Sequence, residues 1–331
     1  MRYMIEEGPL RLQADTDSTI KFWEEISTHV KSVNPDAFLI GEAWADQKTI
    51  SKYYNDGKAL DAVFDFDFGY LVKNYLSQNA SQSADFGSAI NIGRSTSVQN
   101  LWRNLKSRNQ STPLYFYSPF LGNHDKPRTA HELGNDSRLL KLAASLLLTN
   151  PGPVFIYYGE EVGLTQSHKG AAAYQRSLMQ WDESENAGFN DEGPVWLNEL
   201  ERFVSHPDLK IWWPEFWENQ KQRGAHIAGH RSNSESLWHH YKKLLDIRAT
   251  SPAIRAPEFL KFYPQGSDKV WLIEYRKGEN QAWVVINFDL ENPANIVTPN
   301  EMNGVRVNLF ANKTENIREA YTLLPGAIAV F

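Results

Sequence analysis

Short apolar runs alternate with helix-like segments over the first 165 residues of this 331-residue chain, and this alternation is what most constrains the fold. Each run has the length of a buried strand and is followed by polar residues. Apolar strands separated by helices predict parallel βαβ units, in which helices cover both faces of the sheet. The runs lie at 37–41, 62–66, 115–122 and 153–159.

Two α/β architectures fit this alternation. In a (β/α)8 barrel of the TIM type, active sites lie at the carboxyl ends of the strands, which is where polar residues follow these runs. A doubly wound open sheet is the alternative. No glycine-rich phosphate loop follows any of the runs, which weakens the nucleotide-binding version of that alternative. We therefore predict an α/β fold with barrel strands.

Three segments carry the periodicity of amphipathic helices. Residues 19–33 form the first, with Asp17 or Ser18 as the expected N-cap. Helices are also predicted at 137–150 and 235–249. The apolar faces of the first and third helices comprise Ile20, Trp23, Ile26, Val30 and Val33, and Leu237, Tyr241, Leu244 and Ile247.

The character of the sequence changes twice along the chain. Residues 165–235 are rich in Asn, Glu, Trp and Pro and have weak periodicity, so we expect a long excursion from the scaffold. From about residue 255, short β-branched and aromatic runs separated by Gly, Asn and Pro predict a small all-β sandwich. We therefore divide the chain into a barrel part, 1–250, and a β-sandwich domain, 255–331.

Charge and composition exclude several classes of function. The net charge is −6 and no basic patch dominates, so no nucleic-acid partner is expected. The absence of cysteine excludes disulfides and cysteine-based metal sites or nucleophiles. No stretch is apolar enough to span a membrane. The first residues lack the apolar region of a signal peptide, so we expect a cytoplasmic protein if Met1 is the native start, while secretion stays open if the sequence continues upstream.

One carboxylate follows the first apolar run. Glu42 lies in FLIGEAWAD, two residues before Trp44. A carboxyl group against an indole and apolar neighbours loses solvation and keeps its proton more readily, which suits it to act as a general acid. The alternative is a surface-loop glutamate, which GEAW alone favours because short motifs often match by chance.

A second carboxylate follows the run at 115–122. Asp125 lies in GNHDKPR, where hydrogen-bonding side chains gather directly after YSPFL. Core packing does not explain such a cluster, and a structural polar turn is the alternative. An ionised Asp125 would stabilise a cationic sugar transition state, and His124 would donate a hydrogen bond to a sugar hydroxyl. Two carboxylates presented in this way predict cleavage of a glycosidic bond.

Four segments together resemble the α-amylase family of glycoside hydrolases. They are GEAW at 41–44, GNHD at 122–125, PGPVFIYYGEEVG at 151–163 and LMQWDESENAGF at 178–189. Their order and spacing, and the β-rich end of the chain, match the family over nearly the whole sequence. In the last segment, Leu178 stands where the family usually has proline.

The resemblance implies a retaining mechanism on an α-glucan or oligosaccharide partner. By position, Glu42 matches the general acid/base after the fifth barrel strand, and Asp125 matches the transition-state stabiliser after the seventh. His124 would contact the sugar at the cleavage point, Arg128 matches a nearby arginine of some members, and Trp44 would line the site.

The resemblance also implies that the attacking aspartate is missing. In the family it belongs to a motif like G-F-R-x-D-A, which would precede Arg2, as would the first four strands and the calcium loop of some members. The sequence thus predicts the fifth to eighth strands of a partial barrel, inactive alone. We expect no cofactor in this chain, calcium only in the full-length protein, and the missing half-barrel as a partner. Asp65 and Asp67 are candidate substitutes, but structural roles are favoured for both.

Other functions remain open at this point. The missing acid and the aromatic residues at 211–217 also fit a non-catalytic carbohydrate-binding or interaction module. Transglycosylation, or isomerisation of the trehalose-synthase kind, is a further alternative for the full-length protein.

Overall fold

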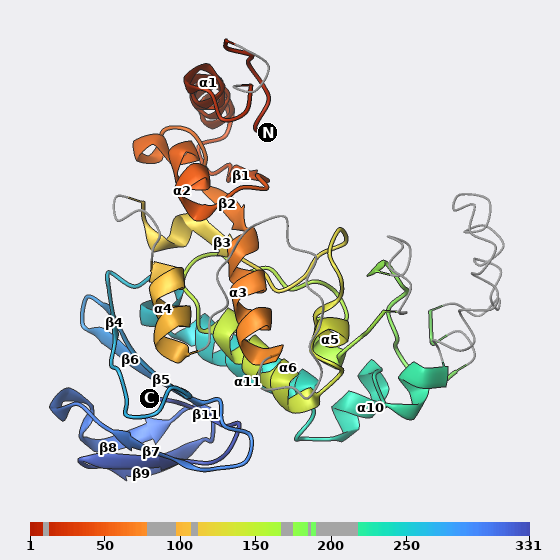
Figure 1. The fold of residues 1–331 in the computed structure, drawn as a ribbon, viewed down its shortest axis with the longest axis vertical. Coiled ribbons are helices and arrows are strands. Elements are labelled where there is room, and N and C mark those ends of the chain that lie inside the picture. The colour runs from red at the N-terminus through yellow and green to blue at the C-terminus, as the bar shows by residue number, and fades with distance from the viewer. Residues whose placement is uncertain (9–12, 78–96, 107–111, 167–174, 185–186, 190–217) are drawn as a thin grey trace.

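The computed structural model describes residues 1–8, 13–77, 97–106, 112–166, 175–184, 187–189 and 218–331. Helix α1 lies at one end of the molecule and a β-rich lobe lies at the other (Figure 1). Helices α3, α4, α6 and α11 lie between them. Within the described ranges, no helix is both long and apolar enough to cross a lipid bilayer.

Three of the expected strands form a parallel sheet in the order β1-β2-β3. They are β1 (Ile40–Gly41), β2 (Ala62–Asp65) and β3 (Tyr117–Pro119). The first strand is shorter than the predicted run at 37–41. Phe38 belongs to that run, but it is 59% exposed and lies outside the sheet. The run at 153–159 contributes only a parallel bridge, between Phe120 and Phe155. The parallel sheet is confirmed, but full strands at 37–41 and 153–159 are wrong.

Helix α1 spans Asp17–Val33, close to the prediction. Its N-cap is Thr16, whose side chain accepts a hydrogen bond from the Thr19 amide at 3.1 Å. The predicted caps, Asp17 and Ser18, are therefore wrong by one or two residues. The extended backbone of Thr16 lets its hydroxyl reach the third helical residue, as N-cap side chains do.

The central helices present apolar faces to one shared core. They are α3 (Phe66–Ser77), α4 (Val98–Lys106), α6 (Ser137–Leu148) and α11 (Leu237–Thr250), with the short helices α2 (Gln47–Ile50), α5 (Thr129–Glu132), α10 (Ile227–Ser232) and α12 (Pro252–Arg255) around them. The predicted face of α11 is confirmed, since all four of its named residues are buried. Helix α3 approaches the chain after β3 closely, because a Cβ on Gly69 would lie 2.7 Å from the Phe120 carbonyl oxygen.

The β-rich lobe consists of antiparallel strands. A four-stranded sheet has the order β11-β6-β5-β4, and two further pairs, β7 with β10 and β8 with β9, complete the lobe. The bounds are β4 (Phe259–Phe262), β5 (Val270–Lys277), β6 (Asn280–Asn287), β7 (Ala294–Val297), β8 (Gly304–Asn308), β9 (Lys313–Ile317), β10 (Ala320–Leu323) and β11 (Ile328–Val330).

Strands β5 and β6 of the four-stranded sheet are buried on both faces. Side chains alternate between the two faces of a strand. Trp271 and Val284 therefore join the same core as the central helices, whereas Leu272 and Trp283 join a second core with β7, β9 and β10. The helical part and the β-rich lobe thus share a continuous apolar core.

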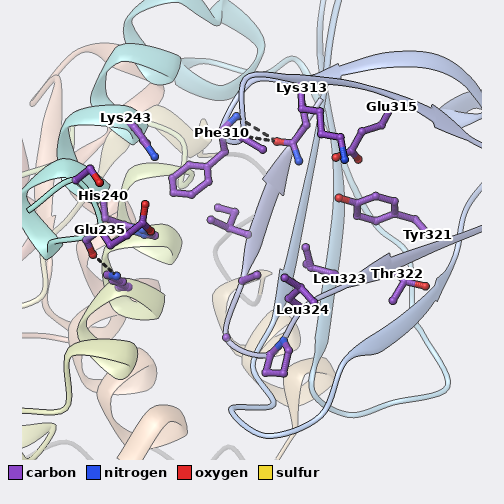
Figure 2. A pocket seen from close by; sticks show the side chains of 18 of the residues that line it. Glu235, His240, Lys243, Phe310, Lys313, Glu315, Tyr321, Thr322, Leu323 and Leu324 are labelled. Atoms are coloured by element: carbon purple, nitrogen blue, oxygen red, sulfur yellow. Dashed lines mark hydrogen bonds between the residues drawn. The ribbon is translucent and has the colours of Figure 1, made fainter.

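A pocket of about 730 Å³ opens where the two parts meet. Figure 2 shows His240 and Lys243 of α11 on one side, and Phe310, Lys313 and Tyr321 of the lobe on the other. The His240 ring packs edge-on to Phe310, with centroids 5.0 Å apart. Its Nε2 lies 2.9 Å from the Ser145 hydroxyl. Burial lowers the pKa of His240 to about 3, so this imidazole is neutral.

Candidate active site

A small pocket of about 160 Å³ lies at the carboxyl edge of the parallel sheet. Residues directly after β1, β2 and β3 contribute to its wall, together with the chain around the bridge at Phe155. It is lined by Glu42, Phe64, Phe66, Phe120, Gly122, Asn123, His124, Phe155, Ile156 and Tyr157. Segments far apart in the sequence thus meet at one edge, which is where parallel α/β folds place their sites.

Aromatic rings form one wall of this pocket. Phe64 on β2 contacts Phe155, with ring centroids 4.7 Å apart, and Phe66 contacts Phe120 at 4.9 Å, both edge to face. Phe66 and Phe120 are almost fully buried, whereas Phe155 is 40% exposed. Phe66 and Phe120 are therefore held within the core, while Phe155 stays accessible to solvent. The wall offers an apolar surface of the kind against which a sugar ring can pack.

Glu42 projects from the loop directly after β1. Gly41 before it packs closely against two side chains, since a Cβ there would come within 2.6 Å of Leu60 Cδ1 and closer still to Met1 Sδ, and both side chains would have to shift. The Glu42 side chain is exposed, and its Oε1 accepts a 2.7 Å hydrogen bond from the indole Nε1 of Trp44. The expected desolvation against the indole is therefore wrong. The indole supplies a hydrogen-bond donor to the carboxylate and does not shield it from water.

Trp44 is not among the residues that line the pocket, but it packs against one of them. The indole packs on Phe66, with ring centroids 4.7 Å apart, and is 42% exposed. Lys126 places its Nζ 4.0 Å from the centre of the Trp44 ring and 5.0 Å from that of Tyr70. Burial, with repulsion from Lys73 as a second cause, lowers the pKa of Lys126. The ammonium thus joins the loop after β1 to the loop after β3.

Asp125 and His124 lie side by side in the loop after β3. His124 lines the pocket, whereas Asp125 is outside the lining residues and has its Oδ2 3.3 Å from His124 Nε2. Its Oδ1 accepts a 2.8 Å hydrogen bond from Arg176, which also donates to the His124 carbonyl oxygen at 3.1 Å. Arg176 therefore anchors both residues, although nothing in its sequence context predicted a role for it.

Arg128 is 2% exposed and lies behind the pocket wall. Its guanidinium donates to the carbonyl oxygens of Tyr158 at 2.6 Å and Gln175 at 3.0 Å, and it stacks near the Tyr157 and Tyr158 rings. Burial lowers its pKa. These contacts fix the segment that carries Arg176. Substrate binding by Arg128 stays a prediction, and its contacts in the structure support the wall.

A buried carboxylate, that of Glu160, supports the loop after β3. Glu160 accepts hydrogen bonds from the Thr129 hydroxyl at 3.0 Å and the Tyr157 amide at 3.4 Å. A Cβ on Gly122 would lie 3.3 Å from its Oε1, so the pocket loop lies directly on this carboxyl. Burial raises the pKa of Glu160 to about 7. Glycine at 122 thus lets the loop and the carboxyl pack closely.

Asp65 and Asp67 have structural roles, as the sequence favoured. Asp65 is fully buried, accepts hydrogen bonds from the Gln47 side chain at 3.2 and 3.3 Å, and accepts another from the Phe68 amide at 3.2 Å. Asp67 accepts a hydrogen bond from the backbone N–H of Gln47 at 3.3 Å. Both acids hold the start of α3 against α2, and neither lines the pocket.

Two further expectations have limited or no structural counterpart. The aromatic segment 211–217 lies outside the described residues, as do 185–186 of the segment at 178–189. In the described ranges, no group of three or more His, Cys, Asp or Glu side chains is arranged to hold a metal ion.

The comparison with protein families gives a match over most of the chain. A family model described as "Alpha amylase, catalytic domain" matches residues 6–256. Alpha-amylase 3 of Dictyoglomus thermophilum is 27% identical over 265 residues, covering 76% of this chain and 45% of that protein. Alpha-amylase SusG of Bacteroides thetaiotaomicron is 28% identical over 276 residues, covering 80% and 34%. The chain spans less than half the length of these two relatives.

Solved structures share the fold. An α-amylase from H. orenii aligns with a TM-score of 0.70 and 20% identity, covering 97% of this chain and 58% of that one. The trehalulose synthase MutB aligns with a TM-score of 0.70 and 18% identity, covering 96% and 59%. At these identities the likeness concerns the fold alone.

Proposed function

The chain belongs to the α-amylase family of glycoside hydrolases, and from this premise we propose that its pocket serves in hydrolysis of α-glucosidic bonds in starch-like glucans or oligosaccharides. One observation carries the proposal. Glu42 and His124, which lie 82 positions apart in the sequence, line one aromatic-walled pocket at the carboxyl edge of the parallel strands. An acid, a hydrogen-bonding imidazole and exposed ring edges are what a sugar ring requires for binding and for protonation of its leaving group.

The proposed architecture follows the same premise. We place β1, β2, β3 and the chain at Phe155 as the fifth to eighth strands of a (β/α)8 barrel, with residues 1–250 as the barrel part and 255–331 as a β-sandwich. The parallel order of β1, β2 and β3 and the parallel bridge at Phe155 support this assignment.

In the proposed retaining mechanism, Glu42 protonates the glycosidic oxygen as the bond to the anomeric carbon breaks, and then removes a proton from the incoming water. The hydrogen bond from Trp44 supports this role by holding the carboxyl group at the pocket edge. Asp125 and His124 would hold the distorted sugar, and Arg176 fixes the position of both. Trp44 and Arg128 would then act on the substrate through the residues they position.

A retaining mechanism also needs an attacking carboxylate about 5–5.5 Å from the acid/base. Among the described residues, Glu42 is the one carboxylate that lines the pocket. Asp65 and Asp67 are bound by Gln47. We therefore propose that none of the described carboxylates is the nucleophile, and that the attacking aspartate lies outside residues 1–331, as the resemblance to the family implies. On this proposal the chain alone has no appreciable glycosidase activity, since the covalent step has no attacking group.

Turnover assays on the purified chain test this proposal. Wild type and Glu42→Gln would be compared on soluble starch and a 4-nitrophenyl α-glucoside, with the matching β-glucoside as a control for linkage. We expect no turnover by either protein. Turnover of the α-linked substrates that Glu42→Gln abolishes would support glycosidase chemistry and contradict the proposed inactivity of the chain alone.

A pocket with a single lining carboxylate favours a second candidate function, carbohydrate binding without catalysis. Calorimetry with maltotriose separates the two. Binding without turnover supports a binding module, whereas neither binding nor turnover supports an incomplete enzyme. For a longer form that does turn over, analysis of the products would separate hydrolysis from transglycosylation or isomerisation.

A further inference from the structure

A second polar pocket, of about 490 Å³, lies away from the candidate active site and shares no residue with it. It lies between the beginning of α6, the turn at 162–163, helix α10 and the beginning of α11. Its polar lining residues are Asn135, Ser137, Lys141, Glu183, Arg223, His226, His230, Asn233, Glu235 and Ser236. Lys141 and Glu235 also border the pocket drawn in Figure 2, where Lys141 donates to the Glu235 carbonyl oxygen at 2.5 Å.

Arg223 brings an uncompensated cation to this pocket. Its Nη2 makes a long hydrogen bond of 3.5 Å to the Gly163 carbonyl oxygen, and its Nη1 is buried without a hydrogen-bond partner. Among the described residues no carboxylate forms an ion pair with it. Burial lowers its pKa, which reflects the cost of holding the charge there. A buried donor without a partner requires an explanation, and an absent ion is one.

His226 brings a second donor that makes no hydrogen bond. The residue is 2% exposed, and its Nδ1 accepts a hydrogen bond from the Gly229 amide at 3.1 Å as the N-cap of α10. That bond places the proton of the neutral imidazole on Nε2. This Nε2 is buried without a hydrogen-bond partner, although Glu183 Oε1 lies 3.4 Å away. The N–H group is therefore a buried donor in a residue that lines the pocket, and Glu183 is the carboxylate beside it.

Neighbouring groups add donors and positive potential. His230 accepts a 3.4 Å hydrogen bond from the Trp238 amide on Nδ1, which leaves its proton on Nε2. Helices α6 and α11 both begin at the pocket, where Ser137 and Leu237 line it. The Asp136 carboxylate caps α6, whereas the neutral Ser236 side chain caps α11, so the partial positive charge that favours anions comes from the N-terminus of α11. The lining also includes two acidic residues, Glu183 and Glu235. The Glu183 side chain is 75% exposed and Glu235 is exposed, so both lie at the rim.

We propose that this pocket binds a phosphate group, either as free phosphate or as the monoester of a sugar. A phosphate offers acceptor oxygens in several directions at once, which matches a guanidinium, an imidazole N–H and the N-terminus of α11 arranged around one cavity. The pocket is larger than a phosphate group alone, which leaves room for an esterified sugar. Glu183 Oε1 lies beside His226 Nε2, where a phosphate oxygen would bind, so phosphate would displace this carboxylate.

Calorimetric titration of the full 331-residue chain with inorganic phosphate and with glucose 6-phosphate tests the proposal. We expect saturable binding of at least one probe, and the probe that binds more tightly identifies the source of the phosphate group. Arg223→Met should weaken binding about tenfold or more, because a charge-assisted hydrogen bond is lost. His226→Asn should also weaken it, while retaining a good N-cap for α10. Glu183→Gln should strengthen binding, because it removes the competing carboxylate.

Two controls keep these results interpretable. Arg231→Met removes an exposed arginine of α10, the helix that His226 caps, and should leave binding unchanged. Without phosphate, Arg223→Met should melt near the wild-type temperature, because the partly buried guanidinium makes one long hydrogen bond, to Gly163, and no ion pair with a described carboxylate. The proposal is overturned if neither probe binds saturably, or if Arg223→Met and Glu183→Gln both bind as the wild type does.

Discussion

The indole Nε1 of Trp44 donates a 2.7 Å hydrogen bond to Oε1 of Glu42. Lys126 sits over the face of the same indole, 4.0 Å from its centre. One side chain therefore ties the carboxylate after β1 to the loop after β3 through two different parts of its ring system. The edge of the ring holds an anion and its face holds a cation, as the charge distribution of an aromatic ring favours.

The contact between Trp44 and Lys126 should contribute measurably to stability. In a double-mutant cycle of Trp44→Ala and Lys126→Met, we expect a coupling energy of about 0.5–1 kcal/mol, the range for a partly exposed cation–π pair. Urea unfolding of the four proteins measures it. Trp44→Phe keeps an aromatic face and should retain part of the coupling. A coupling energy of zero would show that the ammonium does not interact with the ring in solution.

Glu160 should make stability depend on pH. Burial raises its pKa to about 7, whereas the ordinary value is 4.5. Between these values the folded chain holds a proton that the unfolded chain has released. Its contribution to stability is therefore complete below pH 4.5 and is lost as the pH rises through 7, by about 3 kcal/mol in total.

Urea unfolding of wild type and Glu160→Gln at several pH values checks this pH dependence. The difference in the free energy of unfolding between the two proteins should change over pH 4.5–7, because glutamine does not titrate. Glu279→Gln, at an exposed position, is the matched control and should show no such change. A difference that stays constant over this range would contradict a raised pKa at Glu160.

Gly69 should be intolerant of any side chain. A Cβ there would lie 2.7 Å from the Phe120 carbonyl oxygen and 2.8 Å from that of Leu121, and both are backbone atoms. We expect Gly69→Ala to lower the free energy of unfolding by about 2–4 kcal/mol, because α3 must move away from the chain after β3. Gly266→Ala, where a Cβ meets nothing within 4 Å, should stay within about 1 kcal/mol of wild type. Equal melting temperatures for the two variants would refute the close packing.

His124 and Arg128 should differ in what their loss affects. The His124 side chain is 56% exposed, so His124→Ala should change stability by about 0.5 kcal/mol or less while weakening any binding of maltotriose. Arg128→Lys should instead lower stability by about 2–4 kcal/mol, because lysine cannot satisfy both the Tyr158 and Gln175 carbonyl oxygens in the same geometry. Unfolding curves and calorimetry separate the two effects. An unchanged unfolding midpoint for Arg128→Lys would argue against its role in the wall.

Periodic segments were predictable because their own pattern decides their structure. Helices α6 and α11 follow runs whose apolar spacing matches the helical period, and the structure has them within a few residues of the prediction. The run at 153–159 fails for a physical reason. It pairs with the sheet through Phe155 alone and then turns at Gly159, whose φ of +84° ends any strand.

Within the candidate site, only the residues that belong to recognisable sequence motifs could be predicted. Glu42 and His124 were placed at one edge by the rule for parallel strands, and the structure brings them to one pocket. Arg176 escaped notice because it pairs with Asp125 across 51 residues, and no local pattern encodes such a contact. The exposure of Glu42 was also unpredictable, since whether an indole shields a carboxylate or donates to it depends on a side-chain orientation.

The apolar core that runs from the central helices into β5 and β6 has a consequence for engineering. Trp271 and Val284 face the helices and pack into their core, so the shape of this face of the lobe is matched to these helices. Grafting the lobe of a homologue onto this chain would exchange one half of a shared interior for another of different shape. The lobe is therefore poorly suited to domain exchange. Chimeras should be joined within loops that leave this shared interior intact.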